Sequence, residues 1–115
     1  MKIILAFAFI LSFGFTVKPT QFFNTSLTVT VRDELGNTVE GAMVKIFSKE
    51  DDYTKEKNAV EEGTTDAKGI VKFKKLNPEA YFILCRKGDK DNAGGGEKIG
   101  ALKKGEFNKV TVVIQ

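Results

Sequence analysis

Apolar and polar residues alternate along several short segments of the chain, the pattern of strands with one buried face. In Leu27–Arg32 every second side chain is apolar, and the positions between them carry hydroxyl or charged groups. Tyr81–Cys85 is apolar on both faces, which predicts a central strand whose second face is covered by a loop or neighbouring element. The residues that this pattern assigns to the core are Leu27, Val29, Val31, Ala42, Val44, Ile46, Val71, Phe73, Tyr81, Ile83 and Cys85.

Turn residues separate these segments at short intervals. Asp33–Asn37 contains Gly36 and Asn37, the residue types that take positive φ at low cost. Asp66–Gly69 has Asp at the first position and Gly at the last, which predicts a hairpin turn. A second turn follows within residues 76–79, and the apolar segment at residues 110–114 predicts a final docked strand. The spacing of these elements, without a long helical pattern, predicts an all-β sandwich.

Two segments depart from this pattern. Between Ser48 and Glu62 the chain is dense in charges of both signs. Ser48, with Asp51 three residues on, is expected to cap a short helical turn with Tyr53, Lys57 and Val60 on one face. A solvated excursion between strands is the main interpretation of this segment, and a partner-binding insertion is the alternative.

The second departure is the glycine-rich loop that follows the apolar strand. Its hard oxygen donors suggest a Ca²⁺ site, because carboxylate, amide and backbone oxygens are the ligands of this ion. The candidate metal ligands are Asp89, Asp91, Asn92 and Glu97. The spacing differs from an EF-hand loop, and nearby lysines oppose a cation, so a flexible surface loop is the main interpretation. Anion binding by the three consecutive glycines is a further alternative.

The N-terminus has the parts of a secretory signal peptide within residues 1–20. Lys2 supplies the positive charge, and Ile3–Leu11 forms the start of a short apolar helix. Small residues then fit cleavage after Gly14 or after Thr16. The chain is therefore expected to be exported, to the periplasm or the extracellular space.

A retained membrane anchor is the alternative interpretation of this N-terminus. The apolar run is shorter than the roughly 20 residues that a spanning helix needs, so no stable membrane span is expected after cleavage. The folded domain is expected to cover residues 24–115. Phe22 and Phe23 belong either to an edge strand or to the leader.

Composition narrows the possible functions further. The 115 residues include no histidine and one cysteine, Cys85. This excludes catalytic triads that use histidine and the usual zinc sites, and it leaves no partner for an intramolecular disulfide. The net charge of +3 falls to +1 when only residues after Lys18 are counted, because Lys2 and Lys18 precede every acidic residue. The remaining basic residues are mixed with acidic ones along the chain, so no nucleic-acid partner is expected.

Asp33–Ile83 resembles the carboxypeptidase regulatory-like domain, a transthyretin-like, Cna-B-like β-sandwich. The matching residues are Gly36, Val39, Gly41, Ala42, Val44, Thr64, Thr65, Asp66, Gly69, Val71, Phe73, Leu76, Pro78 and Tyr81. The family usually has glycine before that last aromatic residue, where this chain has Glu79 and Ala80. The resemblance implies a seven-stranded Greek-key sandwich of the transthyretin/Ig-like type, used as an accessory module.

Two activities of related sandwiches can be tested against these residues. Some surface adhesins join the first and last strands by a Lys–Asn isopeptide bond. The first strand, Leu27–Arg32, has no lysine, and the last, Val110–Gln115, has no asparagine, so this cross-link is not expected. Transthyretin-like hydrolases use histidines, which the chain lacks.

These observations predict an exported, non-enzymatic β-sandwich module with a binding or structural role in the cell envelope. Its expected partner is an envelope or extracellular protein of unknown identity, and its oligomeric state is open. The alternative is a protein that binds Ca²⁺ or a small ligand through the Asp89–Glu97 loop. No other cofactor is expected.

Overall fold

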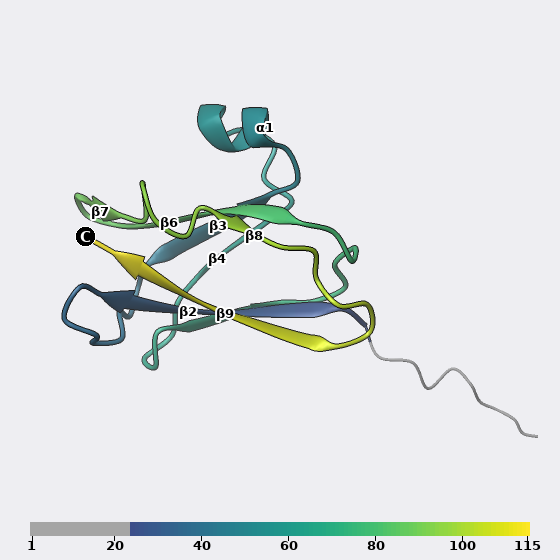
Figure 1. Ribbon diagram of the computed structural model, residues 1–115. Helices are drawn as coiled ribbons and strands as arrows, with labels where there is room; N and C mark the ends of the chain where they lie inside the picture. Colours follow the sequence, from purple (N-terminus) through teal and green to yellow (C-terminus); the bar gives the residue numbers. More distant parts are fainter. Residues whose placement is uncertain (1–23) are drawn as a thin grey trace, which may run out of the picture.

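The computed structural model describes residues 24–115, which form two β-sheets packed face to face and one short helix (Figure 1). The elements in chain order are β2 (Ser26–Asp33), β3 (Met43–Phe47), α1 (Glu50–Lys55), β4 (Glu61–Thr64), β5 (Ile70–Phe73), β6 (Tyr81–Lys87), β7 (Lys90–Asp91), β8 (Lys98–Ile99) and β9 (Phe107–Ile114). The two-sheet, nearly all-β sandwich expected from the alternating pattern is confirmed. The predicted signal peptide, with Phe22 and Phe23, lies outside the described residues.

The smaller sheet has three strands in the order β5-β2-β9. β2 pairs with β5 in antiparallel fashion and with β9 in parallel, from Ser26 opposite Phe107 to Asp33 opposite Ile114. Leu27, Val29 and the other alternate residues of β2 are buried, as the period-2 pattern predicted. The first and last strands of the described chain therefore lie side by side (Figure 1).

The last strand begins at Phe107, three residues earlier than expected, and so includes Asn108. The Asn108 side-chain amide donates hydrogen bonds to the carbonyl oxygens of Ser26 (3.0 Å) and Lys103 (3.2 Å). The interpretation that this strand lacks asparagine is therefore wrong. β2 contains no lysine, so a Lys–Asn cross-link between β2 and β9 still has no lysine to form it.

The larger sheet has five strands in the order β4-β3-β6-β7, with β8 also paired to β6. β6 is central, as its apolar pattern predicted. Its outer edge is shared by two short strands: β8 pairs with Tyr81 and Phe82, and β7 pairs with Arg86 and Lys87. The described residues thus contain eight strands, where seven were expected. The extra strand arises because the glycine-rich loop leaves the sheet between β7 and β8 and divides this edge in two.

The turn at Asp66–Gly69 forms as predicted. The Asp66 carboxylate accepts hydrogen bonds from the backbone N–H groups of Lys68 (2.8 Å) and Ile70 (3.0 Å), and the Gly69 N–H donates to the Asp66 carbonyl (2.9 Å). These bonds to the charged form lower the pKa of Asp66. The prediction that this turn closes a hairpin is wrong, however, because β4 pairs with β3 and β5 pairs with β2.

Thr65 attaches the end of β4 to the five-stranded sheet just before this turn. Its hydroxyl donates to the Val39 carbonyl (2.6 Å) and accepts from the Ala42 N–H (2.9 Å). The side chain is buried, so these bonds fix the end of β4 beside β3. The turn then carries the chain across to the three-stranded sheet.

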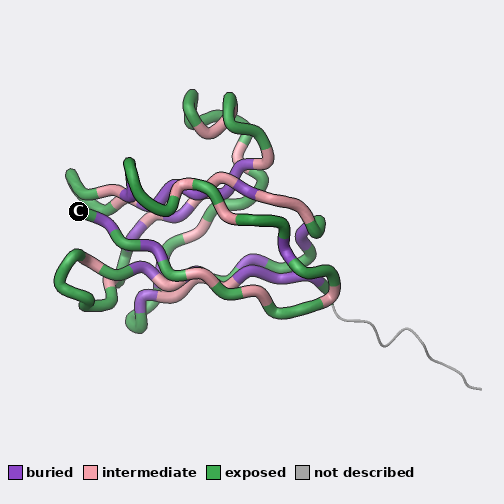
Figure 2. Tube along the Cα trace, in the orientation of Figure 1, coloured by how far each residue is buried: buried purple, intermediate pink, exposed green. Residues whose placement is uncertain are grey.

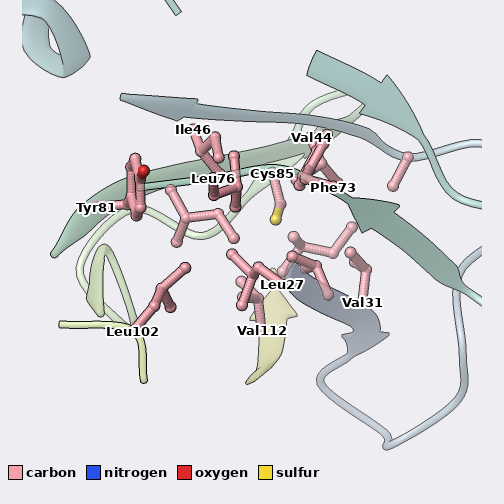
Figure 3. Close-up of a cluster of buried hydrophobic side chains, with 14 residues drawn as sticks. Leu27, Val31, Val44, Ile46, Phe73, Leu76, Tyr81, Cys85, Leu102 and Val112 are labelled. Atoms are coloured by element: carbon pink, nitrogen blue, oxygen red, sulfur yellow. The ribbon is translucent and has the colours of Figure 1, made fainter. Parts of the chain in front are cut away.

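The core lies between the two sheets, where buried stretches of the strands face one another (Figures 2 and 3). Its buried members are Leu27, Val29, Val31, Ala42, Val44, Ile46, Phe73, Leu76, Tyr81, Ile83, Cys85, Leu102, Val112 and Ile114. The assigned core is thus confirmed except at Val71, which is only partly buried against this cluster. The described members of this cluster come from both sheets, so residues 24–115 form a folding unit with a core of their own. Within this described part, no helix is long and apolar enough to cross a membrane.

Candidate functional site

The two segments that depart from the strand pattern meet on the outer face of the five-stranded sheet. α1 lies over this face in Figure 1, and the Tyr53 ring packs against Phe47 and Phe82 with centroid separations of 5.9 Å in each case. The Tyr53 hydroxyl donates a hydrogen bond to Glu97 Oε2 (3.0 Å), at the end of the glycine-rich loop. α1 is therefore the neighbouring element that covers the second apolar face of β6, and it joins the two segments in one site.

α1 is a six-residue helix held by its ends and by Tyr53. Three acidic residues occupy its first turn and Lys55 its last, an arrangement that favours the helix dipole. The N-cap is Lys49 without a side-chain bond, so the predicted cap by Ser48 is wrong. The helix also ends too early to place Lys57 and Val60 on one face with Tyr53. An isolated helix this short is unstable, so its contact with β6 is what stabilises it.

Glu56 fixes the C-terminal end of α1 to the sheet. Its φ of 54° is left-handed, and its N–H returns to the carbonyls of Asp52 and Tyr53. Its carboxylate binds Arg86 of β6 through two bonds of 3.0 and 2.9 Å. The Arg86 guanidinium lowers the pKa of Glu56 by donating to the charged form. This bidentate pair orients the helix end over β6.

A groove of about 450 Å³ lies between α1 and the glycine-rich loop. The residues that line it are Glu50, Tyr53, Phe82, Gly94, Gly95, Gly96, Glu97 and Lys98. The Lys98 ammonium lies 5.6 Å from the centroid of the Phe82 ring, which places a cation beside an aromatic surface. The groove thus presents aromatic rings, acidic and basic side chains, and glycine backbone that no side chain covers. These features suit the binding of a peptide segment of a partner.

Tyr53 is a hydrogen-bond donor in this groove at neutral pH. Burial and the adjoining Glu97 carboxylate raise the pKa of Tyr53 to about 12. The thiol of Cys85, on the opposite face of β6, is fully buried, and burial raises its pKa to about 12. Both groups therefore stay protonated, and neither is activated as a nucleophile or base.

Asn92, one of the candidate metal ligands, has a structural role that the sequence pattern did not indicate. It is only 1% exposed, although this loop was expected to be a flexible surface segment. Its Oδ1 accepts from the Cys85 N–H (2.9 Å), and its Nδ2 donates to the carbonyls of Ile83 (2.9 Å) and Gly96 (3.4 Å). The side-chain amide therefore takes the place of a peptide group along the part of β6 that neither β7 nor β8 covers.

The carboxylates of the other three candidate ligands lie in different surroundings. Asp91 accepts from the Ala93 N–H (3.0 Å), and Glu97 Oε2 accepts from the Gly94 N–H (3.0 Å) as well as from Tyr53. Asp89 is exposed in the turn between β6 and β7. Within residues 24–115 no three His, Cys, Asp or Glu side chains are grouped closely enough to hold a metal ion. The Ca²⁺ site stays a prediction.

The two sheets pack around one core, and the described strand pairs are antiparallel apart from β2–β9. This arrangement is an immunoglobulin-like β-sandwich. A family model, described as "DR_A0283-like, Ig-like domain", matches residues 18–114. The chain belongs to this DR_A0283-like, Ig-like domain family.

Solved structures share this fold at low sequence identity. The group B streptococcus pilus 2b backbone protein matches 79% of the chain with a TM-score of 0.59 and 16% identity. The TIE protein of Bacillus anthracis matches 80% with a TM-score of 0.56 and 23% identity, and BcpA, the major pilin subunit of Bacillus cereus, matches 81% with a TM-score of 0.56 and 15% identity. The chain spans 40%, 17% and 30% of these three proteins, respectively. A comparison with curated proteins finds no match.

Proposed function

We infer that the chain is an exported, non-enzymatic β-sandwich module that binds a protein partner in the cell envelope through the groove beside Tyr53. Export is supported by the signal-peptide pattern within residues 1–20. Two of the similar solved structures are pilus components, which is consistent with a role on the cell surface. A relation to the carboxypeptidase regulatory-like domains is part of this proposal.

The observation that carries the proposal is the Tyr53–Glu97 hydrogen bond of 3.0 Å. It holds two insertions, far apart in sequence, in one arrangement over an otherwise regular sheet. Rigid presentation reduces the ordering cost of binding, which favours a recognition surface. The buried thiol and the raised pKa of Tyr53 also argue for binding and against covalent or acid–base chemistry.

The proposed relation to carboxypeptidase regulatory-like domains is supported by glycine and aspartate residues that form turns between the strands. Gly36 and Gly41 take φ values of 90° and 77°, which favour glycine. Asp66 and Gly69 close the turn between the sheets. The family resemblance is therefore carried by the scaffold, and the groove lies outside the matching residues.

The test has two parts, beginning with export. The full chain is expressed in its native host and recovered from separated cytoplasmic and envelope fractions, and its N-terminus is sequenced. Recovery in the envelope with a new N-terminus before Asn24 is expected. An intact N-terminus in the cytoplasmic fraction would overturn the export proposal.

The second part tests the groove by cross-linked capture from the same envelope fraction. Phe82→Ser and Lys98→Glu alter the groove, while Leu35→Ser is the matched control, since Leu35 is 83% exposed in the β2–β3 turn. Both groove variants are expected to lose a partner that the wild type and the control retain. Equal capture by all four proteins would remove the groove from the proposal.

A further inference from the structure

Lysines that are scattered along the sequence meet at one end of the sandwich, beside the start of β2. All of them are exposed. They are Lys72, Lys74, Lys75, Lys103, Lys104 and Lys109, and we name them the basic end. The fold brings them together because β5 and β9 flank β2, with Lys72 and Lys109 both opposite Thr28.

Three adjoining hollows connect these lysines. One contains Lys75, Lys104 and Asn24, and the next contains Lys72, Lys74, Asn24 and Phe107. A third joins Phe107 to Lys103 and Lys109, so that Asn24 and Phe107 link all three. The basic end is therefore one continuous surface around Asn24, the point where residues 1–23 join the described domain.

Charge is divided unevenly between this end and the rest of the domain. Residues 24–115 hold sixteen basic and fifteen acidic side chains, since Lys2 and Lys18 precede them. Six of the basic groups lie at the basic end against Glu79 and Glu106, leaving ten basic and thirteen acidic groups elsewhere. The ion pairs of the described chain use Lys45, Lys55 and Arg86, so the six lysines of the basic end keep their charge unpaired.

Two further features of the basic end suit a membrane surface. Phe107 is 61% exposed, and the Lys72 ammonium lies 5.2 Å from its ring centroid, which places an aromatic ring among cations. The Ser26 side chain is 3% exposed, lines the hollow with Lys72 and Lys74, and has a hydroxyl with no hydrogen-bond partner within the described chain. A phosphate oxygen bound between these lysines would supply that partner.

We propose that the basic end docks on an anionic phospholipid surface, with the lysines on headgroup phosphates and Phe107 at the interface. Charge complementarity supports this occupant, since six cations face only two acidic groups there, and the exposed Phe107 ring offers the apolar contact that a lipid interface accepts. The groove beside Tyr53 lies on the outer face of the other sheet, so the two surfaces are separate.

The test measures binding of residues 24–115 to sedimented vesicles, and it does not depend on export or on the groove. Vesicles of phosphatidylcholine alone are compared with vesicles of phosphatidylcholine and phosphatidylglycerol in equal amounts. Binding only to the anionic vesicles is expected at about 0.1 M salt, with loss at about 1 M, where the Debye length falls to about 3 Å. Equal binding to both vesicles, or to neither, would overturn the proposal.

Matched charge variants locate the surface. The triple variant Lys72→Gln, Lys74→Gln, Lys104→Gln should bind anionic vesicles about 100-fold more weakly. Each lysine is expected to contribute about fivefold, and the three factors multiply. The control triple variant removes the same charge from exposed lysines elsewhere: Lys49→Gln, Lys57→Gln, Lys68→Gln. Its affinity for the anionic vesicles should fall less than about fivefold. Equal losses in both triples would show a net-charge effect and overturn the assignment of the basic end.

Phe107→Ser separates a lipid surface from another anionic partner. It should weaken vesicle binding severalfold while leaving binding to soluble polyphosphate unchanged. Tighter binding of wild type to polyphosphate than to vesicles, with no effect of Phe107→Ser on either, would replace the membrane with an anionic polymer. Thermal unfolding of every variant shows that the domain is folded, since these side chains lie outside the core.

Discussion

Replacing Asn92 with alanine tests whether one side chain completes the edge of β6. In the wild type the Asn92 amide satisfies the N–H of Cys85 and the carbonyl of Ile83, both in a buried strand. Alanine leaves these two backbone groups without their partner, at about 1–3 kcal/mol for each. We expect the free energy of unfolding to fall by about 2–6 kcal/mol, a large share of the total for a domain of this size.

Urea unfolding followed by circular dichroism measures this change, with the m-value compared to confirm that the compactness of both states is unchanged. Asp89→Ala is the matched control, because Asp89 is exposed in the neighbouring β6–β7 turn, and its effect should stay within about 0.5 kcal/mol. A loss in Asn92→Ala that is no larger than that of the control would refute the structural role of Asn92.

Asn92→Asp separates hydrogen bonding from side-chain volume. A carboxylate still accepts from the Cys85 N–H but repels the Ile83 carbonyl, and burial raises the pKa of the new group above its usual value. A raised pKa means that the protonated form is favoured in the folded state, so stability is lost as the pH rises through that pKa. The deficit relative to wild type should therefore shrink as the pH falls from 7 toward about 4.

Three further outcomes are expected. Gly69→Ala should cost about 3 kcal/mol, because Gly69 has φ +76° and an added Cβ would lie 2.9 Å from the Val31 carbonyl oxygen. Gly94→Ala, at φ +82° but with open space, should cost only about 1 kcal/mol in the same urea assay, and equal costs would contradict the steric argument. Absorbance titration should show Tyr53 ionising near pH 12 in the folded protein, against 10.0 in urea. Because the folded state favours the protonated phenol, this contribution to stability is complete below pH 10 and is lost as the pH rises toward 12. Calorimetric titration with Ca²⁺ should give no heat, while a binding isotherm abolished by Asp91→Asn would establish the calcium alternative.

The alternating pattern predicted the core well because burial depends on periodicity within each strand. Leu27 and Val31 in β2, and Ile83 and Cys85 in β6, face the core at the expected positions. The central position of β6 also followed from the sequence, since a strand with two apolar faces needs cover on both.

Strand partners were harder to predict, because periodicity within a strand does not specify its neighbours. The turn at Asp66–Gly69 has the residues of a hairpin, yet the strands on either side belong to different sheets. The Thr65 hydroxyl, at the end of β4, binds backbone groups more than twenty residues away, while the Gly69 carbonyl accepts from the Val31 N–H of β2. No local pattern reports such a contact.

The candidate site was predicted in part. The charged segment and the glycine-rich loop were both recognised as departures from the strand pattern, but their contact through Tyr53 and Glu97 depends on the tertiary fold. Asn92 was selected for its oxygen, and its amide instead completes a sheet edge. Lysines mixed with acidic residues along the chain likewise gave no indication of the basic end.

The parallel pairing of β2 and β9 determines how the domain responds to tension. Force entering at Ser26 and leaving at Ile114 pulls the two strands past each other along their length, so the whole ladder from Ser26–Phe107 to Asp33–Ile114 is sheared at once. Opening one end at a time would break the same bonds in sequence. The domain should therefore resist stretching between these two points better than peeling of β9 from β2, and forced unfolding in the two geometries compares the rates directly.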